Sequence, residues 1–175
     1  WNQVDPSFPN EPLKLYGPGT DSGTFDYFTD EINGEEGASR TDFSPSEDDN
    51  QIVQGVSSSK GGMGYFGFTY YEENADKLNL VQVNSGNGCV TPSAASVQDG
   101  TYTPLGRGLF IYPSAKSLGS NTAFQSFLQY YVNNDAEIAE AAQFIPLSPT
   151  QQTTLQNEYA AVLKMANVSA SPAAS

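Results

Sequence analysis

The fold is decided by residues 15–28, which read Leu15-Tyr16-Gly17-Pro18-Gly19-Thr20-Asp21-Ser22-Gly23-Thr24-Phe25-Asp26-Tyr27-Phe28. The run starts as an apolar strand, breaks into a glycine-rich loop and continues with apolar residues at helical spacing, so it predicts a strand, a loop and a helix in succession. The first turn of a helix leaves backbone N–H groups without partners and carries partial positive charge. Small residues let a ligand reach these groups, and Ser22 and Thr24 add hydroxyl donors, so this junction is a candidate anion site.

Strand-like and helix-like segments alternate along the rest of the chain, which indicates an α/β architecture. We expect strands over residues 13–16, 63–70, 78–83 and 109–112, and helices over about 22–32, 46–56, 124–131 and 150–165. Asn33 and Gly34 end the first helix in this prediction, and Ser46 is the N-cap of the second. The acidic residues 47–49 are then a solvated first helical turn, and residues 167–175 form a flexible tail.

The composition excludes several classes of function. Seven Lys and Arg stand against 20 Asp and Glu, a net charge of −13, so we expect no nucleic-acid partner. The chain has no histidine and a single cysteine, Cys89, which excludes zinc sites and Ser-His or Cys-His catalysis, and we expect neither a metal nor a cofactor. Because the sequence begins at Trp1 without a methionine, we expect a processed product or a piece of a longer protein.

The glycine-rich loop also invites an enzymatic interpretation. Asp21-Ser22-Gly23-Thr24 matches the Asp-Thr/Ser-Gly-Thr/Ser signature of aspartic proteases, in which two such carboxylates share a proton. Those proteases place the aspartate directly after an apolar strand and continue into strands, whereas here a glycine-rich stretch precedes it and a helical pattern follows. The tetrapeptide occurs once, so a catalytic pair would need a homodimer. An aspartic-protease-like enzyme is therefore a remote alternative.

Two further interpretations of the loop involve nucleotides or no ligand at all. Phosphate-binding loops of nucleotide-binding proteins place a lysine after the glycines, and none follows here. The spacing from Gly17 to Gly23 is one residue longer than the dinucleotide fingerprint. A Ser/Thr/Gly helix entry can also be no more than a well-capped turn.

Several blocks of sequence, in order along the chain, resemble the PstS-type periplasmic phosphate-binding proteins of phosphate ABC transporters. They are residues 22–28 with the Ser-Gly-Thr helix start, Ser39-Arg40-Thr41-Asp42, Ser46-Glu47-Asp48-Asp49-Asn50, Gly62-Met63-Gly64-Tyr65-Phe66-Gly67, residues 99–105 and Arg107-Gly108-Leu109-Phe110-Ile111-Tyr112. The resemblance implies an α/β fold of the type II, venus-flytrap periplasmic-binding-protein kind. It implies high-affinity binding of inorganic phosphate for delivery to a membrane permease, and no catalysis.

The resemblance also implies which residues hold phosphate. The backbone N–H groups of Gly23 and Thr24 and the hydroxyls of Ser22 and Thr24 surround its oxygens. The family places an arginine four residues before the serine, where this chain has Pro18, and we expect Arg40 to substitute unless it forms a surface ion pair with Asp42 or Asp26. Asp21 is the candidate acceptor for the proton on phosphate, although it can instead orient Arg40 or cap the helix. Arg107 is expected to be structural.

Complete relatives in this family are roughly twice as long as the present chain, which implies that the chain is partial and lacks the N-terminal part of the first lobe. Residues 1–105 are then mostly the second lobe, and residues 106–166 are the hinge return and the C-terminal helices that pack with the first lobe. The expected partners are phosphate, the ABC transporter permease and the N-terminal half of the same protein, in a periplasmic or extracytoplasmic location. The alternative is an interaction or surface-display module that keeps the fold without transport.

Overall fold

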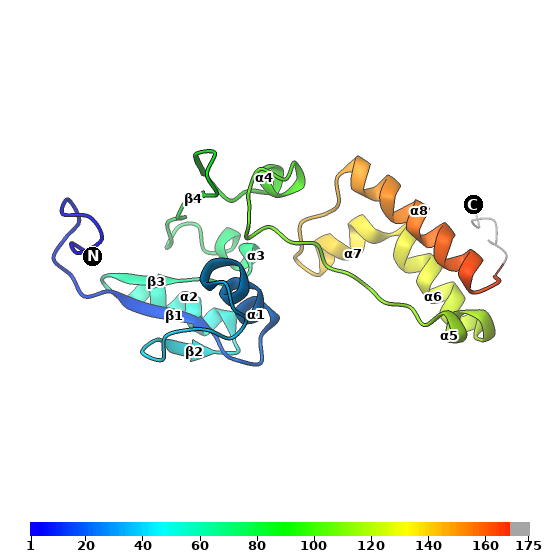
Figure 1. The fold of residues 1–175 in the computed structure, drawn as a ribbon, viewed down its shortest axis with the longest axis horizontal. Helices are drawn as coiled ribbons and strands as arrows, with labels where there is room; N and C mark the ends of the chain where they lie inside the picture. Colours follow the sequence, from blue (N-terminus) through cyan, green and yellow to red (C-terminus); the bar gives the residue numbers. More distant parts are fainter. Residues whose placement is uncertain (169–175) are drawn as a thin grey trace. The chain divides into compact units, whose positions relative to one another are not determined.

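The computed structural model describes residues 1–168, which form two compact units, Trp1–Arg107 and the chain from Gly108 onward (Figure 1). The first unit contains strands and helices, and the second contains helices. No helix within residues 1–168 is both long and apolar enough to cross a membrane. Most of the predicted flexible tail, residues 169–175, lies outside the described residues.

A parallel three-stranded sheet organises the first unit, with strand order β2-β1-β3. The strands are β1 (Lys14–Pro18), β2 (Ser44–Ser46) and β3 (Gly62–Gly64). Tyr16 of β1 is in register with Ser44 on one side and with Gly64 on the other. The winding of the chain therefore reverses at β1, and the carboxyl ends of all three strands meet at one edge of the sheet.

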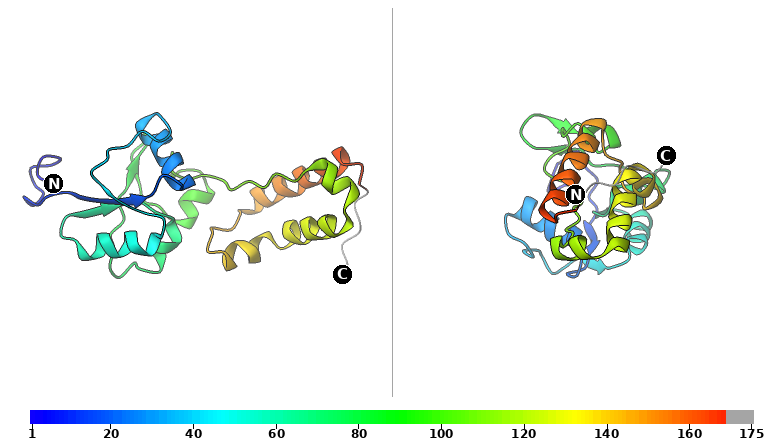
Figure 2. Two further views of the ribbon diagram at one scale, coloured as in Figure 1. Left: turned by 90° about the horizontal axis from the view of Figure 1, so that it is seen from below. Right: turned by 90° about the vertical axis from the view of Figure 1, so that its right-hand side faces the viewer.

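Helices connect the strands and cover both faces of this sheet. Helix α1 (Gly23–Phe28) leads from β1 toward β2, and α2 (Asp49–Ser58) leads from β2 to β3. The two helices lie on opposite faces (Figure 2, left), as right-handed crossovers in opposite directions require. Phe25 is buried under α1, and Ile52 and Val53 are buried under α2.

Helix α1 continues directly into a π-helical segment, η1 (Thr29–Asn33), so the predicted helix over 22–32 is confirmed. The buried Thr29 hydroxyl donates to the carbonyl oxygens of Phe25 and Asp26, at 2.9 and 3.0 Å, and accepts from the backbone N–H of Gly37 at 2.8 Å. The helix ends at Gly34, whose φ of 79° places it in the left-handed region. The stop signal at Asn33 and Gly34 is therefore confirmed.

The second helix begins later than predicted, and Ser46 is not its N-cap. Ser46 is the last residue of β2, and its carbonyl oxygen accepts from the backbone N–H of Gly19 at 3.2 Å. This contact keeps Ser46 in the extended conformation of the sheet, and Asp48 takes the N-cap position with its side chain accepting from the N–H of Asn50.

The remainder of the first unit contains α3 (Phe68–Glu72), β4 (Val83–Asn84), β5 (Cys89–Val90) and α4 (Ala94–Gln98). The predicted strand over 63–70 is confirmed only at Met63 and Gly64, where β3 ends. Gly67 is the N-cap of α3, and the Phe68 and Tyr71 rings pack one helical turn apart, with centroids 6.0 Å apart. The predicted strand over 78–83 is wrong except at Val83, which pairs with Val90 in a separate antiparallel ladder.

The second unit contains α5 (Ala115–Ser120), α6 (Thr122–Asn133), α7 (Asp135–Ala141) and α8 (Pro149–Met165). The predicted helices over 124–131 and 150–165 are confirmed. Their core comprises Leu118, Leu128, Val132, Leu163 and Ala166. Helix α8 begins with a capping box, in which Ser148 and Gln151 satisfy each other's backbone N–H groups.

The predicted strand over 109–112 is wrong for this chain. Leu109, Phe110, Ile111 and Tyr112 belong to no strand, and they are 63%, 74%, 45% and 89% exposed. Within residues 1–168 no strand lies beside this segment to complete its backbone hydrogen bonds.

Candidate functional site

The glycine-rich loop lies at the carboxyl end of the central strand β1, where the winding of the sheet reverses. Open α/β sheets bind their ligands at this position. Gly17, Pro18 and Gly19 are buried, and the loop becomes exposed at Thr20. The Tyr65 ring covers this strand end, because a Cβ atom at Gly17 would lie 2.9 Å from its Cε1. Tyr65 also stacks on Phe28 with ring centroids 3.8 Å apart, and burial raises the pKa of its hydroxyl.

The structure brings the predicted residues Ser22, Gly23 and Thr24 together at the start of α1. Ser22 is the N-cap, and its hydroxyl oxygen accepts from the backbone N–H of Thr24 at 3.2 Å. The Ser22 N–H donates to the carbonyl oxygen of Gly19 at 3.2 Å, which closes the turn before the helix. Gly23 is exposed and Ser22 and Thr24 are half-buried, so a small ligand can reach all three.

Arg107 lies at the same helix start, which the sequence did not predict. Its Nη2 atom would be 3.6 Å from a Cβ atom at Gly23, and its guanidinium lies over the Tyr27 ring at 5.1 Å from the centroid. The Tyr27 hydroxyl donates to the carbonyl oxygen of Pro104 at 2.7 Å, which ties the segment before Arg107 to α1. Burial first, and then the nearby Glu31, raise the pKa of Tyr27.

Arg40 forms a bidentate ion pair with Asp42. Its Nε and Nη2 atoms donate to the two carboxylate oxygens of Asp42 at 2.5 and 2.6 Å, and both side chains are more than half exposed. The Arg40 guanidinium keeps the pKa of Asp42 below its ordinary value. The alternative of a surface ion pair is thus formed in the structure, and the phosphate-binding role of Arg40 stays a prediction.

Two carboxylates border the loop, the predicted Asp21 and the unpredicted Glu47. Asp21 is exposed, and its backbone N–H donates to Oε1 of Glu47 at 3.4 Å. The same oxygen lies so close to Gly19 that a Cβ atom there would be 1.9 Å from it, so only glycine fits beside the present side chain. The sequence did contain a signal for Glu47, because the loops after two neighbouring parallel strands meet at one edge of the sheet.

Negative charge continues from Glu47 into the first turn of α2. Burial is the main cause that raises the pKa of Asp49, and the charges of Asp48 and Glu47 raise it further, against a hydrogen bond from the backbone of Gly67. The site therefore combines the amide, hydroxyl and guanidinium donors of the helix start with carboxylate acceptors that border the preceding loop. This combination suits an anion that carries a proton, because each of its oxygens then meets a group of the opposite hydrogen-bonding type.

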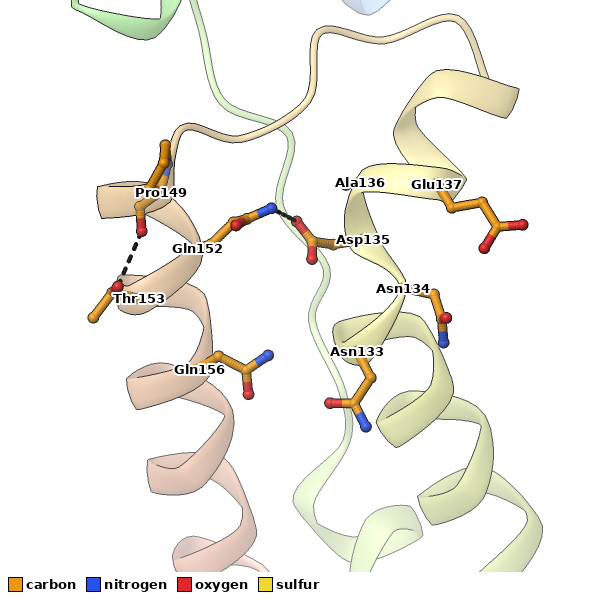
Figure 3. A pocket seen from close by; sticks show the side chains of 9 residues that line it. All are labelled: Asn133, Asn134, Asp135, Ala136, Glu137, Pro149, Gln152, Thr153 and Gln156. Carbon is orange, nitrogen blue, oxygen red and sulfur yellow. Dashed lines mark hydrogen bonds between the residues drawn. The ribbon is translucent and has the colours of Figure 1, made fainter. Parts of the chain in front are cut away.

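A concave region of about 500 Å³ lies within the second unit. It is lined by the end of α6, the start of α7 and the first turns of α8 (Figure 3). Its lining residues include Asp135 and Glu137 but no lysine or arginine, and Gln152 donates to Asp135 at 3.5 Å. An anion would meet carboxylates without a cation there, so the start of α1 is the better candidate site.

Comparison with protein-family models matches residues 1–135 to the PBP superfamily domain. The chain belongs to the PBP superfamily. The predicted α/β fold of the periplasmic-binding-protein kind is confirmed, and so is the resemblance to PstS-type proteins. The Asp21–Thr24 tetrapeptide opens a helix in this PBP-superfamily fold, whereas in aspartic proteases it continues into a strand.

Curated relatives and a solved structure extend this result. The chain is 46% identical to Protein SphX of Synechococcus elongatus over 160 residues, which cover 91% of this chain and 47% of the relative. It is 36% identical to the phosphate-binding protein PstS of Staphylococcus saprophyticus over 159 residues, 90% of this chain and 49% of the relative. A crystal structure of a possible phosphate binding protein from Planctomyces limnophilus matches with a TM-score of 0.75 and 36% identity, covering 93% of this chain and 58% of that one. The chain thus spans about half the length of the curated relatives it matches.

Proposed function

We propose that this member of the PBP superfamily binds inorganic phosphate at the start of α1 and catalyses no reaction. The observation that carries the proposal is the Ser22-Gly23-Thr24 helix start at the carboxyl end of β1, within reach of an arginine. The names of the PstS relative and of the Planctomyces protein support phosphate as the anion.

Binding requires one local rearrangement at the N-cap. The Ser22 hydroxyl oxygen now accepts from the Thr24 N–H, so it occupies a donor that phosphate needs. Rotation of the Ser22 side chain frees this N–H and lets the hydroxyl donate to the ligand instead. A phosphate oxygen then receives the amides of Gly23 and Thr24, and the helix start stabilises its charge.

We propose that a carboxylate beside the loop selects hydrogen phosphate over sulfate. Asp21 is the predicted acceptor, and Glu47 borders the same loop. A carboxylate can accept a hydrogen bond from the P–OH group, but it faces an unprotonated oxygen of sulfate with like charge and no shared proton. The acidic character of the loop therefore favours the protonated ligand.

We further propose that the chain acts as part of a longer binding protein that delivers phosphate to an ABC transporter permease outside the cytoplasm. Residues 1–105 would be mostly the second lobe, and residues 106–166 the hinge return with helices that pack on the first lobe. The exposed apolar residues 109–112 support this division, because they suit contact with a missing part of the fold. The same exposure also fits an interaction or display module without transport.

Titration of the isotopically labelled chain with phosphate and with sulfate, followed by NMR, tests the proposed site. Phosphate should shift the amide signals of Gly23 and Thr24, and sulfate should shift them far less. Thr24→Ala should weaken phosphate binding by about tenfold or more, because it removes a hydrogen bond to a charged group. The matched control is Thr153→Ala on α8, whose hydroxyl donates to Pro149 at 3.0 Å.

Two results would contradict the proposal. One is a wild-type chain whose Gly23 and Thr24 signals do not respond to phosphate at millimolar concentration. The other is an equal loss of phosphate affinity in Thr24→Ala and Thr153→Ala, which would show that phosphate binds elsewhere or that the effect of Thr24→Ala is nonspecific. Weak binding that maps to α1 is still support, because NMR detects affinities too low for calorimetry.

A further inference from the structure

The positive charges of the first unit are few enough to be accounted for one by one. Residues 1–107 contain five lysines and arginines, namely Lys14, Arg40, Lys60, Lys77 and Arg107. Arg40 is paired with Asp42, and Lys60 is paired with Glu11. Lys77 donates to the side-chain oxygen of Asn74 at 3.0 Å. Lys14 begins β1, roughly 13 Å along the strand from the end that carries the loop.

Arg107 differs from these four residues in position, and from Arg40 and Lys60 also in having no ion pair among residues 1–168. Its guanidinium lies beside Gly23, at the start of α1. The ion pairs found within residues 1–168 are Arg40–Asp42 and Lys60–Glu11, so no carboxylate lies within 4.0 Å of the Arg107 charge. The Cζ atom of the guanidinium lies over the Tyr27 ring, 5.1 Å from the centroid, a cation–π contact that uses none of its hydrogen-bond donors.

The surrounding contacts hold Arg107 at this position. Gly23 and Tyr27 are one helical turn apart on the same face of α1, so a side chain over the Tyr27 ring extends to the helix start. The hydrogen bond from the Tyr27 hydroxyl to Pro104 fixes the chain three residues before Arg107. The absent side chain at Gly23 leaves the space in which an anion could contact both the helix start and the guanidinium.

We propose that Arg107 is the cationic partner of the anion at this site and that Tyr27 positions it, an inference that rests on the proposed function. The planar guanidinium donates two parallel hydrogen bonds to two phosphate oxygens, while the amides of Gly23 and Thr24 hold a third. This arrangement supplies the arginine that Pro18 does not provide, from a segment distant in sequence.

The test compares two variants that remove the same charge, Arg107→Gln and, at an exposed lysine with no proposed role in binding, Lys77→Gln. Phosphate affinity is measured from the amide shifts of Gly23 and Thr24 at several salt concentrations. Arg107→Gln should weaken binding by about tenfold or more, because it removes a charge-assisted pair, and it should flatten the salt dependence. Lys77→Gln has the same net charge and should change affinity by less than about twofold.

Two further variants separate direct contact from a structural effect. Arg107→Lys keeps the charge but loses the planar guanidinium that donates two parallel hydrogen bonds. Its affinity for phosphate should therefore lie between those of the wild type and Arg107→Gln. Tyr27→Phe removes the hydrogen bond to Pro104 but keeps the ring, so it should weaken binding less than Arg107→Gln does. If Arg107→Gln fails to fold, Arg107→Lys and Tyr27→Phe carry the test.

The outcomes distinguish this inference from the proposed function. If the wild type binds phosphate and Arg107→Gln binds equally well, the assignment of Arg107 is wrong while the phosphate site stands. A loss in Lys77→Gln as large as that in Arg107→Gln would show that net charge, and not the position of Arg107, determines the affinity. If the wild type does not bind phosphate, the proposed function fails and this inference fails with it.

Discussion

Strand β1 and the segment 109–112 are both short apolar runs that end at a proline, but their surroundings differ. β1 lies between β2 and β3, which complete hydrogen bonds along both of its edges. The segment 109–112 pairs with no strand among residues 1–168, and Tyr112 is 89% exposed. An apolar run becomes a strand only where neighbours satisfy its backbone groups and cover its side chains. The comparison supports the proposal that a further part of the binding protein covers the second run.

The largest expected difference between the two regions is the stability lost when an apolar side chain is shortened. One isoleucine in each region is replaced by alanine to measure it. Ile52, on the helix that covers β1, is 1% exposed, so Ile52→Ala should lower the free energy of unfolding by about 2–5 kcal/mol. Ile111→Ala, at a residue 45% exposed, should change it by less than about 0.5 kcal/mol. Urea denaturation followed by far-UV circular dichroism measures both variants. The fluorescence of the single tryptophan, Trp1, which donates to Gly61, reports the first unit separately.

Amide hydrogen exchange supplies the matching measurement for the second region. Amide exchange at residues 109–112 should be fast in the wild-type chain and equally fast in Ile111→Ala. Protection of these amides in the wild-type chain would mean that residues 109–112 pack in solution. A decrease in the free energy of unfolding of Ile111→Ala close to that of Ile52→Ala would mean the same, and the proposed difference between β1 and this segment would then be wrong.

The strand-loop-helix run was predictable because its signals are local. Ser22 caps the helix with its own side chain, and Gly34 ends it with a backbone conformation that favours glycine. Ser46 shows the limit of such signals, because an N-cap residue and the end of a strand look alike until the partner strand is known. The hydrogen bond from Gly19 decides that Ser46 belongs to the sheet.

The candidate site was predictable only where its residues are adjacent in sequence. Ser22, Gly23 and Thr24 share one helical turn, so their proximity follows from the helix alone. Arg107 reaches the same turn from the far end of the first unit, and nothing in the local pattern indicates the Tyr27 ring as its support. Tertiary contacts of this kind are set by the path of the chain and not by local propensity.

A smaller effect is expected at the helix starts that follow the two apolar runs. Ser22 caps α1 after β1, and Ser114 caps α5 after residues 109–112, each with its hydroxyl oxygen. Ser22→Ala should destabilise the first unit by about 1 kcal/mol. Ser114→Ala should have less effect, because its bond to Ser117 is longer, 3.4 Å against 3.2 Å, and the preceding segment is unpaired.

Amide exchange within α1 and α5 reports each cap separately. The expected result is a faster exchange of the first α1 turn in Ser22→Ala, with a smaller change in α5 for Ser114→Ala. An effect at Ser114 as large as that at Ser22 would show that capping alone, without a paired strand before it, orders the start of a helix.

The smallest expected effect is the pH dependence of stability that Asp49 causes. It arises because Asp49 is partly buried in the packed region around β1. Its pKa in the folded chain lies above the ordinary value of 3.8, mainly because of burial and then because of Asp48 and Glu47. Ionisation is therefore less favourable in the folded state than in the unfolded state. The contribution of Asp49 to stability is fully present below the unfolded-state pKa and is lost as the pH rises through the higher folded-state pKa.

Asp49→Asn should consequently gain stability relative to the wild type as the pH rises from below 3.8 through the folded-state pKa, and the difference should then level off. Asparagine keeps an acceptor for the Gly67 backbone, so the comparison isolates the charge. The control is Asp99→Asn, because hydrogen bonds from Thr101 lower the pKa of Asp99, and its difference from the wild type should have the opposite sign. Urea denaturation of the three proteins at a series of pH values measures both differences. If the free energies of unfolding of Asp49→Asn and the wild type differ by the same amount at every pH, the Asp49 carboxyl group is as solvated in the folded chain as in the unfolded chain. The start of α2 would then be exposed to solvent like residues 109–112, and not packed like β1.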